Sequence, residues 1–340
     1  MSIPYRTQQN IKRGLVTLLI LLVVGGLLWG LWFLWLQRYV VYTRDAGAVI
    51  DFEVSETLAP GQEAKPPEDA LQVEIHYNEG DDMVSISKEL TQLKGYYIPA
   101  TDLAADPALV WEQVQVLPAN TPIMLDVKSI YGEFYYSTGL DRPISSSVNV
   151  AAVEELLTNL KNKGYYTIAR VPALRDRAYG LENVADGLPI TGGYLWMGEE
   201  GCYWLNPNRE GTISYLLDIA SELRDMGFNE VVFDEFRFPE TDQIIFEEDK
   251  LQALTDTAKL LVTSCATDYF AVSFVSDGTW TLPEGKSRMY RTDVSTPAEM
   301  MELVENLTLD NPAVRLVFIT NNMDARFEEY GVLRPANLVH

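Results

Sequence analysis

From about residue 83 to residue 335, the sequence alternates between stretches with the apolar spacing of helices and short apolar stretches typical of strands. Several of these strands are apolar on both faces, which is typical of parallel strands covered by helices. We therefore expect an α/β fold with a mainly parallel sheet and helices outside it. The pattern predicts strands within 96–103, 121–129, 165–174, 229–240, 269–278 and 313–322, and helices within 83–95, 149–164, 211–227, 247–265 and 296–307.

The length of this region favours a closed barrel over an open sheet. About 250 residues is the usual size of a (β/α)8 TIM barrel. A doubly wound open sheet is the alternative, but the sequence contains neither glycine-rich phosphate-binding pattern of its nucleotide-binding forms. The later strands are short, and no eighth strand is evident near 330–340. We expect a TIM-like barrel whose second half is degenerate, and whose first helix, 83–95, ends at Gly95.

Residues 14–36 carry no charge and are long enough to span a bilayer as a helix. Trp29, Trp32 and Trp35 crowd the end of this stretch, where an aromatic belt would lie. A cleaved signal peptide is the alternative, although its apolar region is normally shorter and ends in small residues. We expect an uncleaved transmembrane anchor that contacts the lipid bilayer through these residues.

The charges beside the expected anchor predict its orientation. Arg6, Lys12 and Arg13 precede it, whereas the arginines that follow are soon offset by acidic residues. This bias favours a cytoplasmic N-terminus and an extracellular C-terminal domain in a single-pass protein of the cell membrane. The expected order is therefore a cytoplasmic segment (1–13), the anchor (14–36), a juxtamembrane stalk rich in Pro, Glu and Ala (37–70), and the barrel domain (71–340).

Composition excludes several kinds of function. The net charge of −23 would repel a phosphate backbone, so nucleic acid is not an expected partner. With only two histidines, His76 and His340, a histidine-rich metal site is excluded and a catalytic triad would depend on His76. Cys202 and Cys265 match no metal or redox spacing, and the sequence leaves open whether they form a disulfide.

Charged residues recur where the predicted strands end. Asp126, Arg170, Asp234 and Asp277 each close an apolar strand, and Glu235 and Arg237 lie just beyond Asp234. The carboxyl ends of parallel barrel strands meet at one rim, where active sites of such barrels are built. Since side chains alternate along a strand, Asp234 and Glu235 face opposite ways, and only one of them can face the barrel axis while the strand stays regular.

Paired carboxylates at one rim suit glycoside cleavage. This reaction needs a carboxylic acid to protonate the leaving oxygen and a carboxylate as nucleophile or base, and it needs no cofactor. Aromatic side chains that can stack on sugars follow the third strand, at Tyr194, Trp196, Tyr203 and Trp204. Two alternatives stay open: buried ion pairs that only shape the rim, and a carboxylate site for Mg²⁺ or Ca²⁺.

Three stretches carry a family resemblance: "IMLDVKSIYGEFYYST", "TIARVPALRD" and "YWLNPNREGTISYLLDIASELRDMGFNEVVFDEFRFP". They resemble the bacterial "putative glycoside hydrolase" family of TIM barrels, whose members show a strand reading FDYxRFP. The resemblance covers roughly residues 93–240. It implies a rim set of Asp126, Lys128, Arg170, Asn206, Asp234 and Arg237. Glu235 stands where the family has an aromatic residue, and no family motif is matched after residue 240.

We therefore expect a membrane-anchored glycoside hydrolase acting on a polysaccharide or oligosaccharide of the cell envelope or the surroundings. Asp234, Glu235, Asp126 and Asp277 are the candidate catalytic residues. The resemblance implies that Asp234 is the nucleophile or stabilising carboxylate. The resemblance does not identify the acid/base, and Glu235 or Asp277 is our candidate for it. The candidate substrate-binding residues are Arg170, Arg237, Lys128, Trp196, Trp204 and Asn206. A non-catalytic glycan-binding or envelope scaffold on a decayed barrel is the alternative hypothesis.

Overall fold

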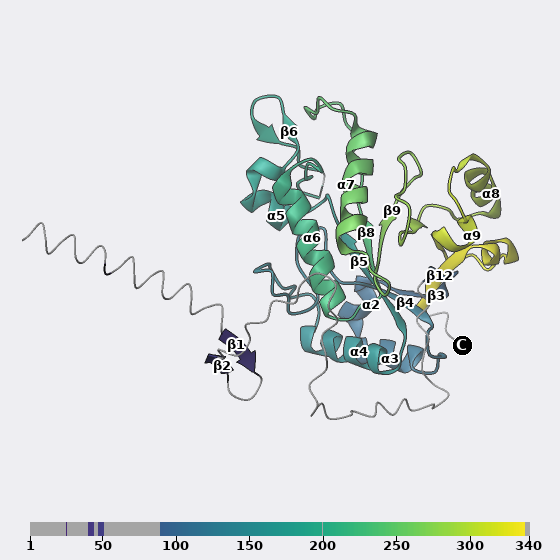
Figure 1. Cartoon of the computed structure of the whole chain (residues 1–340). Helices are drawn as coiled ribbons and strands as arrows, with labels where there is room; N and C mark the ends of the chain where they lie inside the picture. Colours follow the sequence, from purple (N-terminus) through teal and green to yellow (C-terminus); the bar gives the residue numbers. More distant parts are fainter. Residues whose placement is uncertain (1–24, 26–39, 44–46, 51–88, 199, 337–340) are drawn as a thin grey trace, which may run out of the picture. The chain divides into compact units, whose positions relative to one another are not determined.

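The computed structural model describes residues 25, 40–43, 47–50, 89–198 and 200–336 (Figure 1). The chain divides into two units, Met1–Glu79 and Gly80–His340. In the first, β1 (Val40–Thr43) and β2 (Gly47–Ile50) form an antiparallel hairpin. Apart from Gly25, the predicted anchor at 14–36 lies outside the described residues, as do most of the predicted stalk and both histidines. No helix within the described ranges has the length and apolar character needed to cross a bilayer.

The second unit contains eight parallel strands that close into a barrel. The strands are β3 (Lys94–Ile98), β4 (Pro122–Asp126), β5 (Tyr166–Pro172), β8 (Glu230–Asp234), β9 (Ala271–Val275), β10 (Met289–Arg291), β11 (Leu316–Ile319) and β12 (Gly331–Pro335). Each pairs in parallel with the next, and β12 pairs with β3 to close the ring. The predicted barrel is confirmed and the open sheet is excluded.

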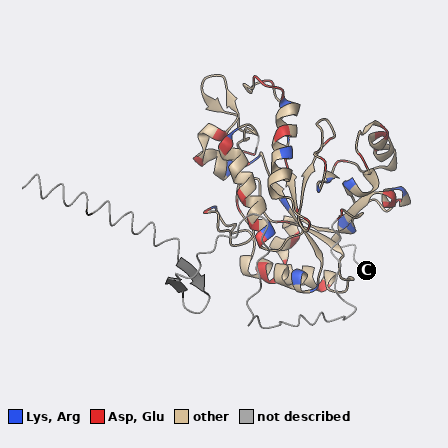
Figure 2. Cartoon of the chain, in the orientation of Figure 1, with Lys and Arg blue, Asp and Glu red and all other residues tan. Residues whose placement is uncertain are grey.

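Helices occupy the connections mainly in the first half. They are α2 (Ala100–Ala105), α3 (Pro107–Val114), α4 (Val150–Asn162), α5 (Arg177–Glu182), α6 (Glu210–Asp225), α7 (Lys250–Cys265), α8 (Pro297–Asn306) and α9 (Pro312–Arg315), with short 3-10 turns η2 (Val184–Asp186) and η3 (Ala325–Glu329). A small hairpin, β6 (Pro189–Ile190) and β7 (Tyr194–Leu195), lies between β5 and α6. Charged residues concentrate on the helices and loops, whereas the central strands carry few (Figure 2).

Side chains alternate between two apolar layers. One residue from most strands fills the barrel interior: Met124, Ile168, Val232, Tyr290, Val317 and Leu333. The neighbouring residues on the same strands, such as Leu125, Ala169 and Phe233, pack outward against the helices. This period of two fixes which strand residues point toward the barrel axis.

The second half of the barrel departs from regular strand–helix units, as the sequence suggests. Residues 276–288, between β9 and β10, contain no helix, and only η3 separates β11 from β12. The sequence analysis misses β10, which is three residues long, and β12, which supplies the eighth strand at Gly331–Pro335. β10 holds too few residues for a periodic pattern to stand out. β12 is as long as β4, but Gly331, Arg334 and Pro335 interrupt its apolar pattern.

The predicted helix at 83–95 is wrong in its described part. Residues 89–93 are irregular, and Lys94–Ile98 forms β3. Gly95 does not end a helix but pairs with Leu333 in the barrel. A Cβ added at Gly95 would lie 2.0 Å from the Pro122 carbonyl oxygen, so glycine lets β3 approach the start of β4.

Replacing Gly95 with alanine should therefore destabilise the barrel by about 1–3 kcal/mol, because the new methyl group meets backbone that cannot easily move. Equilibrium denaturation of the two proteins would measure this difference. Gly139→Ala is the matched control, since its added Cβ meets nothing closer than 3.5 Å. Equal stability of Gly95→Ala and the control would show that β4 can shift to accept the methyl group.

Candidate active site

The carboxyl ends of β4, β5 and β8 bring Asp126, Arg170 and Asp234 together. Each lies two residues after an interior residue of its own strand, namely Met124, Ile168 or Val232. Asp126 is also the register partner of Arg170 across the β4–β5 pair. Asp234, rather than Glu235, therefore takes the axis-facing position of its strand.

Arg170 bridges the two carboxylates. Its Nη2 lies 2.6 Å from Asp234 Oδ2, and its Nη1 lies 3.3 Å from Asp126 Oδ1. Burial opposes the charged form of the guanidinium, but Asp234, Tyr97 and Asp126 together outweigh it and raise the pKa of Arg170. About one fifth of each side chain is exposed, at 20%, 19% and 19% for Arg170, Asp126 and Asp234. The cluster is thus paired and yet open to solvent.

Tyr97 on β3 completes this cluster, and the sequence analysis does not identify it. Its hydroxyl donates to Asp126 Oδ2 at 2.7 Å and accepts from Arg170 Nη1 at 2.5 Å. The Ala100 N–H donates to the same Asp126 oxygen at 2.9 Å. Burial raises the pKa of Asp126 despite these donors, and burial likewise raises the pKa of Tyr97. A tyrosine at a strand end has no charge to mark it in sequence.

The strand ends at Asp234 because the next residue adopts a left-handed conformation. Glu235 has φ of +49°, a conformation that non-glycine residues rarely adopt. Its N–H turns back to donate to Asp234 Oδ1 at 2.7 Å, and the Ala173 N–H donates to the Asp234 carbonyl at 2.7 Å. Asp234 is therefore fixed by contacts on both carboxylate oxygens and on its backbone.

Glu235 pairs with two arginines. Arg175 Nη1 donates to Oε1 at 3.1 Å, and Arg237 Nη2 lies 3.0 Å from Oε2, as an ion pair without hydrogen-bond alignment. Both guanidinium groups also lie over the Trp204 ring, at 5.7 and 5.0 Å from its centre. Glu235, which the sequence could not place, is thus held in a frame of two cations, and Arg175 is a further residue that the sequence analysis misses.

A cavity of about 480 Å³ opens beside these residues. Its lining includes Arg170, Asp234, Glu235, Arg237, Asp277 and Trp280. Asp126 is not part of the lining, because it lies on the other side of Arg170 with Tyr97. Of the four predicted catalytic carboxylates, three therefore share one open cavity and the fourth supports it.

Asp277 reaches the cavity two residues after the end of β9. Its Oδ1 accepts from the N–H and the hydroxyl of Thr279 at 2.9 and 2.6 Å. Asp277 is exposed, and in the described part of the chain it forms no ion pair. A further lining carboxylate, Asp293, follows β10 and is held by two hydrogen bonds from Arg291, which lower its pKa. The sequence analysis misses Asp293 because β10 is not recognised.

The aromatic loop mainly packs against its surroundings. Trp204 is 4% exposed and forms a small apolar cluster with Leu188 and Ile244, against which Trp196 packs. Tyr194, at the end of the β6–β7 turn, is 72% exposed. Neither tryptophan lines the cavity, and their proposed sugar contacts stay a prediction.

Lys128 and Asn206 lie away from the cavity. Lys128 is fully buried, 2.7 Å from Asp176 Oδ2, and donates to the Pro172 carbonyl. Asn206 is 8% exposed, and its side chain accepts from the Asn208 N–H within a turn. The structure gives both residues a role in shaping the loops behind the rim and does not bring them to the candidate site.

Both cysteines are described, and they do not form a disulfide. Cys202 and Cys265 are both buried free thiols, and burial raises the pKa of each. Within the described ranges, no three His, Cys, Asp or Glu side chains are placed to hold a metal ion together.

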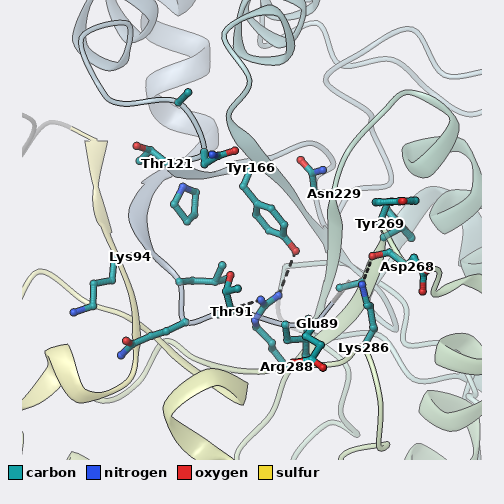
Figure 3. Close-up of a pocket in the computed structure, with 18 residues that line it drawn as sticks. Glu89, Thr91, Lys94, Thr121, Tyr166, Asn229, Asp268, Tyr269, Lys286 and Arg288 are labelled. Carbon is teal, nitrogen blue, oxygen red and sulfur yellow. Dashed lines mark hydrogen bonds between the residues drawn. The ribbon is translucent and has the colours of Figure 1, made fainter. Parts of the chain in front are cut away.

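A second cavity, of about 460 Å³, lies at the amino ends of the strands (Figure 3). Arg288 at its base is 1% exposed and pairs with the fully buried Glu230 at 2.5 Å. Glu230 also accepts from the hydroxyls of Tyr166, Tyr290 and Ser273. This end of the barrel therefore holds a closed ionic network, whereas the opposite end presents carboxylates to an open cavity.

Residues 95–270 match the family described as "putative glycosyl hydrolase domain". The chain belongs to this family. The matched segment includes Tyr97, Asp126, Arg170 and Asp234, and it ends before Asp277. No curated protein matches the sequence significantly.

Two solved alpha-galactosidases share the barrel fold. An alpha-galactosidase from Lactobacillus brevis is 9% identical with a TM-score of 0.50, over 72% of this chain and 37% of that one. A GH36 alpha-galactosidase from Geobacillus stearothermophilus is 10% identical with a TM-score of 0.50, over 74% and 40%. The glycoside hydrolase domain of PelA from Pseudomonas aeruginosa is 13% identical with a TM-score of 0.43, over 74% and 97%. This chain thus covers less than half of either galactosidase, and the similarity shows the fold alone.

Proposed function

We propose that the barrel hydrolyses a glycosidic bond of a polysaccharide at the cavity beside Asp234. The observation that carries this proposal is that Asp234 and Asp277, from adjacent strands β8 and β9, line one open cavity. Two carboxylates flanking a cleft are the groups that glycoside hydrolysis requires, without histidine or metal.

The two carboxylates differ in a way that suits two roles. Asp234 lies 2.6 Å from Arg170 and accepts a backbone N–H, so it is fixed and paired with a cation, as a nucleophile or stabilising carboxylate should be. Asp277 is exposed and its carboxylate forms no ion pair among the described residues, although Arg291 Nη1 donates to its backbone carbonyl, and a carboxyl group open to solvent suits the role of proton donor. Glu235 is held by two arginines, and we assign it a supporting role at the rim.

The proposed activity is tested by incubating the full-length protein with a panel of envelope and capsule glycans and measuring new reducing ends. The panel includes α-galactosides, because two structural neighbours are alpha-galactosidases. Release of reducing ends by the wild type, and its loss in Asp234→Asn, is the expected result. Equal release by wild type and Asp234→Asn would remove Asp234 from the reaction, and no release by the wild type from any glycan would contradict the proposed activity.

Replacing Asp277 with asparagine should lower turnover of a natural glycan by about 10²-fold or more, because general acid catalysis contributes at least this much. The Asp277→Asn variant should cleave an aryl glycoside with an acidic leaving group nearly as well as the wild type does, because such a leaving group departs without needing a proton. Steady-state kinetics on both substrates separate the roles. Glu235→Gln is the comparison variant, and a leaving-group dependence in that variant instead would transfer the acid role to Glu235.

We also propose that residues 14–36 anchor the protein in the cell membrane with the barrel outside. The uncharged length and the flanking charges of this stretch support the proposal. Protease added to intact cells should degrade the barrel domain and spare an epitope placed before residue 14. Recovery of the whole protein from the soluble fraction would contradict it.

A non-catalytic glycan-binding scaffold is the second candidate. It is favoured by one observation, that arginines pair with Asp126, Asp234 and Glu235 at the rim. A scaffold should bind a glycan without releasing reducing ends. If the protein is a scaffold, the Asp234→Asn change should alter its affinity for that glycan less than about threefold, and the wild type should show no turnover. If the protein is a hydrolase, the wild type should show turnover, and the Asp234→Asn variant should still bind the glycan but lose that turnover.

A further inference from the structure

The Arg170 guanidinium is held only by its two terminal nitrogens. Nη2 contacts Asp234, and Nη1 contacts both Asp126 and the Tyr97 hydroxyl. Its Nε is buried and has no hydrogen-bond partner in the described part of the chain. Because the long arginine side chain has many rotamers, its contacts on Nη1 decide whether it stays against Asp234.

Of the two contacts on Nη1, the one to Tyr97 is the shorter. It measures 2.5 Å, against 3.3 Å for the contact between Nη1 and Asp126 Oδ1. The Tyr97 hydroxyl donates a hydrogen bond to Asp126 Oδ2 at 2.7 Å, so one O–H group fixes the arginine and the carboxylate together. The guanidinium also lies 5.3 Å from the centre of the Tyr97 ring.

We propose that Tyr97 is a positioning residue whose hydroxyl, set between Asp126 and Arg170, holds the Arg170 guanidinium against Asp234. The proposal rests on the proposed function, in which Asp234 carries the reaction. Tyr97 is not among the residues that line the cavity. It acts through Arg170, which does line it.

The same three groups make the arrangement dependent on pH. The titratable and charged groups that interact with Asp126 are Tyr97 from β3, Arg170 from β5, Asp234 from β8 and Tyr135 from the loop after β4. Burial raises the pKa of Asp126, whereas Arg170 and the Tyr97 hydroxyl lower it. Loss of the hydroxyl should therefore raise that pKa further. Protonated Asp126 holds Arg170 less well. As the pH is lowered, a variant without the hydroxyl should therefore lose activity at a higher pH than the wild type does.

The test is Tyr97→Phe in the full-length chain, which keeps the ring and removes the hydroxyl. Tyr166→Phe is the matched control, because the Tyr166 hydroxyl likewise donates to a carboxylate, Glu230, and accepts from an arginine, Arg288, at the opposite end of the barrel. Figure 3 shows the contact with Arg288. We expect Tyr97→Phe to lower kcat about tenfold with KM within twofold, and to move the acid limb of the pH–rate profile to higher pH. Tyr166→Phe should change neither. An unchanged profile in Tyr97→Phe, or the same change in both variants, would overturn the proposal.

A second measurement does not depend on catalysis. The ¹³C resonance of the Asp126 carboxyl, assigned through its loss in Asp126→Asn, is followed as a function of pH. Its midpoint should rise in Tyr97→Phe and stay unchanged in Tyr166→Phe. A rise in a protein that cleaves no glycan would refute the proposed function and retain the coupling. An unchanged midpoint in an active enzyme would refute the coupling alone.

Discussion

Asp234→Asn should abolish glycan hydrolysis, with a fall in turnover of about 10³-fold or more. Asp234 is the only carboxylate of the described rim that combines an axis-facing strand position, an Arg170 contact at 2.6 Å and a place in the cavity wall. A nucleophile or stabilising carboxylate loses its function when its charge is removed, because an amide neither attacks the anomeric carbon nor stabilises positive charge there.

The same change should cost some stability. Two donors, Arg170 Nη2 and the Glu235 N–H, point at different oxygens of Asp234, and an amide offers only one acceptor. One donor is left unpaired, at a cost of about 1–3 kcal/mol. Activity should therefore be measured below the unfolding transition of the variant. Asp225→Asn, an exposed residue paired with Arg224 on α6, is the control for the chemical change alone.

Comparison with the wild type also separates the two candidate functions. A wild type that cleaves a glycan, together with a folded Asp234→Asn protein that binds it without cleaving it, supports hydrolysis, whereas a wild type that binds a glycan and cleaves none supports the scaffold. Retention of more than about one tenth of the wild-type turnover would remove Asp234 from the reaction. The search for the nucleophile would then move to Asp293, the cavity carboxylate that Arg291 keeps ionised.

The strand-end charges could be predicted from sequence because two simple rules act together. Parallel barrel strands end at one rim, and side chains alternate along each strand. Asp126, Arg170 and Asp234 satisfy both rules, so a charge after an apolar strand was enough to find them. The face of Glu235 could not be predicted, because the left-handed backbone at this residue breaks the alternation on which the argument relied.

The residues that sequence analysis missed have other causes. Tyr97 and Arg175 matter through partners that are distant in the chain, at separations the sequence pattern does not record. Asp293 was missed because it follows β10, a strand of three residues. Lys128 shows the converse, since a charge close to a strand end can be used entirely for a buried ion pair with Asp176. The prediction of a helix at 83–95 is wrong in its described part, because Gly95 does not end a helix. The lack of a side chain at Gly95 lets β3 lie close to the start of β4.

Glu230→Gln should be the most destabilising of the single substitutions considered, by about 3–5 kcal/mol. Glu230 is fully buried and balances the charge of Arg288, which is 1% exposed. Glutamine keeps the shape but leaves a buried guanidinium without a counter-charge, which costs this much in comparable sites. It also replaces an acceptor with a donor among the hydroxyls of Tyr166, Tyr290 and Ser273. Reversible denaturation would measure the loss, roughly 6–20 °C in melting temperature for a domain of this size.

The matched control is Glu328→Gln. Glu328 contacts Lys94 and Arg334 but is 39% exposed, so its loss should cost less than about 1 kcal/mol. In the double variant Glu230→Gln/Arg288→Met neither member of this pair carries a charge. The free-energy cost of the double change should therefore be smaller than the sum of the costs of the two single changes. Additive costs, or a loss below about 1 kcal/mol for Glu230→Gln, would show that water reaches this end of the barrel. A double variant that costs much less than the sum of the two single changes would mean that Glu230 and Arg288 act together as a buried pair that stabilises the amino ends of the barrel. The rim combines the same three residue types, in Tyr97, Asp126 and Arg170, beside an open cavity, where we propose that they serve chemistry.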